Sequence, residues 1–165
     1  MLDLLARITR MLSTAFLWFA GAGLVLMTAI IGWQVFARYA LEASPTWAEQ
    51  ASLVLMIWYI SLAAAAGVRE RFHIRITAVE DAVTPAARAR MEVISNLVVL
   101  TLGLTMAACG AELTIATWGH NIPTLSLPRG VAYVPISLAG LLIALFALEH
   151  ILAGMLGRKV EPLWR

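Results

Sequence analysis

The sequence predicts an all-α integral membrane protein with four transmembrane helices, and two observations carry this prediction. Of its 165 residues, 61% are apolar and only 13% are charged, whereas a soluble domain averages about half apolar and a quarter charged. The charges are also grouped, so that four long runs contain none: residues 11–37, 50–68, 93–111 and 130–148. Each run approaches the roughly 20 residues that cross a bilayer as a helix.

The first helix is expected over residues 11–38. Arg7 and Arg10 precede it as they would precede a secretory signal. Its charge-free run greatly exceeds the roughly 7–15 apolar residues of a signal, so we expect a retained helix. In residues 2–12 the charged and apolar side chains fall on opposite faces, which is typical of a lead-in helix at the membrane surface.

The second helix is expected over residues 46–68, after the turn "RYALEASPTWAEQ" (residues 38–50). Thr46 and Glu49 have the spacing of a capping box, and Ser44-Pro45 offers an alternative start. Arg38 and Glu49 should lie at similar depth across this short turn, where opposite charges can pair.

The link between the second and third helices predicts a short amphipathic helix lying on the membrane, because Ile76, Val79 and Val83 recur at helical spacing. Thr84 and Pro85 then predict an N-cap and a first helical residue, so the third helix is expected over residues 85–117. Arg88 and Arg90 would meet anionic lipid headgroups on the cytoplasmic side.

The fourth helix is expected over residues 130–154, after an outer link rich in turn formers. Small residues one turn apart predict close helix packing, and they are Ala63 with Gly67, Gly103 with Ala107, and Gly140 with Ala144. We expect one membrane domain over residues 1–165. The lone Cys109 can form no internal disulfide, which excludes enzymes that exchange disulfides through cysteine pairs.

The distribution of cations predicts the orientation. Of the twelve lysines and arginines, only Arg38 and Arg129 flank the helices on one side, which leaves ten on the other. Positive loops stay in the cytoplasm, so both termini and the 69–92 link should face inward. The basic pI therefore reflects cations that flank the membrane helices and set their orientation, and we expect no nucleic-acid partner.

Polar chemistry in the middle of the predicted spans is nearly absent. The most polar residues there are Gln34, Ser61, Thr101 and Thr105. Glu112 and Glu149 lie near helix ends, where we expect them to reach headgroup depth. No proline interrupts the middle of a run, as it would in the broken helices of many carriers. The chain is therefore expected to be no enzyme and to move no solute by itself.

A redox-enzyme anchor that binds haem or quinone is the alternative function. His73 and His150 both fall at inner helix ends, where two histidines could clamp a haem. His73 lies beyond an arginine cluster rather than inside the apolar span, which favours an interfacial role. A small self-assembling exporter would need an acidic residue inside the first helix, and the sequence has none there.

Several short motifs follow one another along the chain. They are "VFARY" at the end of the first helix, "WAE" opening the second, "IWY" in its middle, "RERFHI" after it, and "TLSLPRGVAY" before the fourth. In this order they resemble the small membrane subunit of TRAP transporters, the tripartite ATP-independent periplasmic carriers. Gln50 and Ser137 stand where the family commonly has glutamate and proline.

The resemblance implies a non-catalytic subunit of a sodium-coupled transporter for organic acids in the bacterial inner membrane. Its partners would be a large membrane subunit, which holds the substrate and sodium sites, and a periplasmic substrate-binding protein, which this subunit helps to dock. No cofactor is expected on this chain. The motifs supply the candidate partner contacts: Arg38, Tyr39, Trp47, Glu49, Trp58, Arg69, His73 and Pro128.

Overall fold

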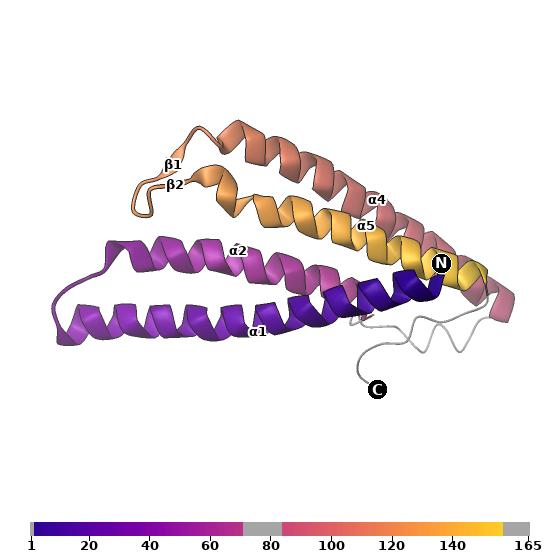
Figure 1. Cartoon of the computed structure of the whole chain (residues 1–165), viewed down its shortest axis with the longest axis horizontal. Helices are drawn as coiled ribbons and strands as arrows, with labels where there is room; N and C mark the ends of the chain where they lie inside the picture. Colours follow the sequence, from indigo (N-terminus) through magenta and orange to yellow (C-terminus); the bar gives the residue numbers. More distant parts are fainter. Residues whose placement is uncertain (1, 71–83, 157–165) are drawn as a thin grey trace.

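The computed structural model of the chain describes residues 2–70 and 84–156 (Figure 1). Four helices in this part of the chain are long and apolar enough to cross a membrane, as the sequence predicts. They are α1 (Leu2–Ala40), α2 (Thr46–Arg69), α4 (Pro85–Thr117) and α5 (Val134–Met155). Between α4 and α5 lie the antiparallel strands β1 (Asn121–Ile122) and β2 (Leu127–Pro128), followed by the 3-10 helix η1 (Arg129–Ala132). The amphipathic helix expected around Ile76, Val79 and Val83 lies outside the described residues.

The start of α4 follows the sequence prediction. The Thr84 hydroxyl accepts a hydrogen bond from the Ala87 backbone amide at 3.4 Å, and Pro85 is the first helical residue. The N-cap thus satisfies one of the amides that a helix start leaves unpaired.

The first helix begins earlier than expected, because residues 2–12 continue directly into α1. Within this stretch Ile8 and Met11 are exposed, whereas Thr9 and the following Ser13 are buried. The protein-facing side of the lead-in is therefore polar. This side of α1 packs against charged residues of α2 and α5, as the site below shows.

The helices form an open row rather than a closed bundle. The principal contacts are those of α1 with α2, α2 with α5, and α5 with α4. Figure 1 shows the α1–α2 and α4–α5 pairs converging at one end, near the end of α2, and separating toward the end that holds β1 and β2. We call these the Arg69 end and the hairpin end. Because α1 and α4 are the edges of the row, they bury the smallest share of their spans.

Small residues bring the helices close together. Gly103 on α4 faces Gly140 on α5 so closely that a methyl group built on Gly103 would lie 2.8 Å from the Gly140 carbonyl oxygen. This confirms the packing predicted from the two small-residue pairs on these helices. Between α2 and α5 the core is likewise built around alanine, and its buried members are Ala65, Ala139, Ile143 and Phe146.

Candidate functional site

The turn between α1 and α2 folds back over the end of α1. The Ala43 amide donates to the Ala37 carbonyl at 3.0 Å. The Arg38 guanidinium donates to the Ser44 hydroxyl from two nitrogens, at 3.3 and 3.4 Å. Arg38 therefore holds the turn in place from the last turn of α1.

The expected pairing of Arg38 with Glu49 is wrong, and so is the capping box. Ser44 lies nearer to Arg38 along the turn and takes its hydrogen bonds. The N-cap of α2 is Pro45, whose backbone is extended and which offers no side-chain cap. Thr46 is consequently already helical, and Glu49 falls one position beyond the place from which a capping-box glutamate reaches back. Glu49 stays exposed in the first turn, where a carboxylate interacts favourably with the helix dipole.

The hairpin end exposes large side chains beyond the length needed to span a bilayer. Roughly 20 helical residues cross the apolar core of a bilayer. Counted along α1 from the buried Ser13, at the Arg69 end, that length ends at Trp33. The turn lies further along α1 and should stand above the apolar core. On it Tyr39 is 80% exposed and Trp47 is 43% exposed. Aromatic side chains are enriched at protein contacts.

Trp58 and Pro128 have contacts within the chain. The Trp58 indole donates to the Val131 carbonyl in η1 at 3.1 Å, which connects the middle of α2 to the start of the α5 segment. Pro128 pairs with Asn121 in the β hairpin and is the N-cap of η1. Both side chains are only partly exposed. They position the hairpin end, and their contact with a partner remains a prediction.

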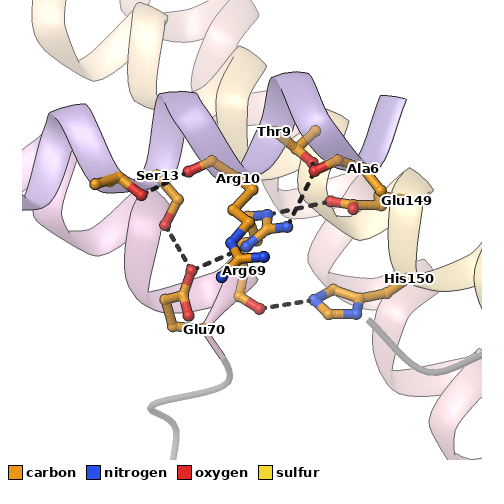
Figure 2. Close-up of polar contacts among 9 residues, drawn as sticks. Ala6, Thr9, Arg10, Ser13, Arg69, Glu70, Glu149 and His150 are labelled. Carbon is orange, nitrogen blue, oxygen red and sulfur yellow. Dashed lines mark hydrogen bonds and ion pairs between the residues drawn. The ribbon is translucent and has the colours of Figure 1, made fainter. Parts of the chain in front are cut away.

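Arg69 is the centre of a buried charged cluster (Figure 2). Its Nη1 lies 3.0 Å from Oε1 of Glu70, and its Nε lies 3.5 Å from Oε2 of Glu149 on α5. Its Nη2 also donates to the Ala6 carbonyl on α1 at 3.4 Å. All three charged side chains are 0–3% exposed. A single guanidinium therefore connects α1, α2 and α5.

Uncharged partners complete this Arg69 cluster. The Ser13 hydroxyl donates to Glu70 Oε1 at 2.8 Å, and Thr9 interacts with the Glu149 carboxylate. His150 Nε2 lies 3.2 Å from the Arg69 carbonyl oxygen, and since a carbonyl only accepts, the ring donates. The cluster consists of Thr9, Ser13, Arg69, Glu70, Glu149 and His150.

The cluster differs from the sequence expectations in two ways. Glu149 was expected to reach headgroup depth, and that prediction is wrong, because the side chain turns inward to Arg69 and is buried. Arg69 was expected at a partner interface, yet its side chain is occupied within the chain. One signal could have indicated the cluster: Arg69-Glu70 and Glu149-His150 both end apolar runs on the same predicted side. His73 lies outside the described residues.

Comparison with known proteins decides the family. A model for the DctQ component of tripartite ATP-independent periplasmic transporters matches residues 27–157, most of the chain. The chain belongs to the DctQ family. It is also 22% identical over 137 residues to a Haemophilus influenzae protein that carries the name TRAP transporter small permease protein, and the match covers 79% of this chain and 81% of that protein.

Membership of the DctQ family makes this chain a TRAP transporter component and implies association with the large permease and the substrate-binding protein. DctQ proteins are non-catalytic components, which disfavours the redox-anchor alternative. The geometry of His150 points the same way, because its Nε2 is engaged with the Arg69 carbonyl in a buried position. Within residues 2–70 and 84–156, no group of three or more His, Cys, Asp or Glu side chains could hold a metal ion.

Proposed function

We propose that this DctQ chain is a non-transporting scaffold of a sodium-coupled organic acid carrier. It would support the large membrane subunit and present its α1–α2 turn to the substrate-binding protein. Sodium and substrate would bind to the large subunit, and this chain would need no cofactor. We place it in the bacterial inner membrane with both termini in the cytoplasm.

One observation carries the proposal: the threonine hydroxyls inside the membrane spans and the charges of the Arg69 cluster have partners within the chain. The hydroxyls of Thr28, Thr101 and Thr105 each donate to a backbone carbonyl of their own helix at 2.8–2.9 Å. The charges of the Arg69 cluster pair with one another in a buried position. A carrier needs polar groups available to its solute at mid-depth, so the moving parts belong to a partner.

The docking role is supported by the charges left available at the hairpin end. Glu49 is exposed and, among the described residues, forms no ion pair. Tyr39 and Trp47 lie in the same segment and are exposed. Aromatic side chains are enriched at protein contacts, and Glu49 adds a charge that a cation of the partner can pair with.

Transport by the assembled complex tests this function. In proteoliposomes with a sodium gradient, the chain alone should take up none of a panel of labelled mono- and dicarboxylates. The chain with its large subunit and binding protein should take up one or more of them. Glu49→Gln and Arg38→Gln should leave the protein inserted and abundant but reduce this uptake, by about tenfold if a desolvated charge pair with the partner is lost.

Ser44→Ala is the matched control for the turn variants. It removes the acceptor of Arg38 and keeps both charges. Uptake near that of the unmodified chain would show that the partner requires the charges rather than the turn geometry. Uptake by the chain alone would refute the scaffold role, and full uptake with both charge variants would refute docking through this turn.

Orientation is tested by cysteine labelling in a Cys109→Ala background. Ala43, Thr84 and Asn121 are all exposed, so an introduced thiol can react at each. Because the basic segments should stay in the cytoplasm, cysteines at Ala43 and Asn121 should react with an impermeant maleimide from the periplasm. A cysteine at Thr84 should react only after the membrane is permeabilised. The reverse pattern would invert the topology and place the turn in the cytoplasm.

A further inference from the structure

The edge helix α4 has an uncovered face of unusual composition. It packs on α5 through the buried Gly103, Ala107 and Gly110. Its opposite face is exposed and carries a row of small and polar side chains at helical spacing. We call this row the α4 face, and it consists of Thr101, Thr105, Ala108, Cys109 and Glu112.

Other exposed surfaces of the row are suited to lipid. In the span of α5 the exposed large side chains include Leu138, Leu141 and Leu148, and α2 exposes Leu53 and Ile60. Lipid tails offer nothing to a carboxylate such as that of Glu112, whereas small residues let another helix approach closely. The α4 face therefore has the composition of a helix–helix contact.

Glu112 distinguishes α4 from the other edge helix. It lies within the span of α4, and among the described residues it forms no ion pair. The edge helix α1 also leaves Gly21 and Gly32 open, but it has no charged residue between Arg10 and Arg38. A carboxylate in a membrane span needs a cation or a hydrogen-bond donor, so Glu112 indicates a partner of complementary charge.

We propose that the α4 face binds a transmembrane helix of the large membrane subunit. That helix would place small residues against Thr105 and Ala108, and an arginine, lysine or hydrogen-bond donor at the depth of Glu112. The proposal rests on the function proposed above. It names the interface through which the scaffold holds its partner.

Three other occupants fit this face less well. A second copy of the chain, related by a two-fold axis along the membrane normal, would bring Glu112 against Glu112 at equal depth, because such an interface is self-facing. Like charges repel there. The substrate-binding protein is soluble and does not enter the membrane. Lipid alone would leave the carboxylate dependent on headgroup contacts.

The native Cys109 reports on this face, because it is the single cysteine of the chain and is exposed. In mild detergent, a membrane-permeable maleimide should label Cys109 in the isolated chain and at least about tenfold more slowly in the purified complex with the large subunit, because an interface core excludes solvent. A matched control introduces Val25→Cys on α1 in a Cys109→Ala background. Val25 is 70% exposed, and its cysteine should react equally in both samples.

Side-chain variants test the partner directly. Ala108→Trp and Glu112→Lys should reduce co-purification of the large subunit about tenfold or more, since a bulky or like-charged group prevents close approach. Ala64→Trp, at an exposed position of α2, should leave it unchanged, and the isolated variants should insert as the unmodified chain does.

The outcomes separate this inference from the scaffold function. If the large subunit co-purifies with every variant and Cys109 stays reactive in the complex, the α4 face is not the interface, although the scaffold role stands. Protection of Val25→Cys in place of Cys109 would assign the interface to α1. Protection of Cys109 by self-association in the isolated chain would assign the face to a second copy. If the unmodified chain never binds the large subunit, the scaffold role and this inference both fall.

Discussion

Arg69→Ala is expected to deplete the protein from the membrane fraction and to lower the unfolding temperature of the purified chain. The guanidinium compensates the carboxylates of Glu70 and Glu149, and all three are buried. Removing one partner of a buried ion pair typically costs about 3–5 kcal/mol, because it leaves an uncompensated charge. Here it also removes the hydrogen bond to Ala6, which joins α1 to the other two helices.

Three further variants separate this explanation from a general loss of charge. Arg7→Ala removes an exposed arginine of α1 at the Arg69 end of the row and should change stability little. Arg69→Lys should be intermediate, because an ammonium lacks the planar fork of donors that reaches several acceptors. Arg69→Met combined with Glu149→Gln should recover part of the loss, since it removes one of the stranded charges. Equal stability of Arg69→Ala and Arg7→Ala would show that the cluster does not hold the row together.

Features set by the local sequence were predictable. The start of α4 follows from Thr84 and Pro85, whose capping geometry depends only on the next few residues. The four spans follow from hydropathy, because lipid requires a continuous apolar helix. The close α4–α5 contact follows from the small residues around Gly103 and Gly140.

Features that depend on three-dimensional convergence were not predictable. Thr9 and Ser13 resemble tolerated hydroxyls in an apolar run, and only the fold places them beside charged side chains of α2 and α5. Glu149 can reach the headgroups or turn inward, and the position of Arg69 decides between these. The capping box failed because Pro45 occupies the N-cap, so a motif with the correct letters is offset by one position.

Gly140→Leu is expected to separate α4 from α5 and to unfold the hairpin end. A methyl group at Gly140 would lie against the Ala107 amide nitrogen and 2.7 Å from the Gly103 carbonyl oxygen. Both obstacles are backbone atoms, so no side-chain rotation can relieve the overlap. Overpacking a core typically costs about 1–3 kcal/mol. A leucine adds three more carbons, so we expect a loss near or above the top of that range.

Gly32→Leu is the matched control, since nothing lies within 4 Å of the position that its first side-chain carbon would take. It should leave stability unchanged or raise it slightly, because leucine favours helix more than glycine does by up to about 1 kcal/mol. The unfolding temperature in detergent measures the change in stability. The reactivity of Cys109 reports whether the face of α4 away from α5 stays accessible. Gly140→Leu should lower the unfolding temperature, and Cys109 should remain reactive in the isolated chain, because it lies on the face of α4 away from α5. If Gly140→Leu is as stable as Gly32→Leu, the two helices have room to move apart, and the small residues are not what sets their separation.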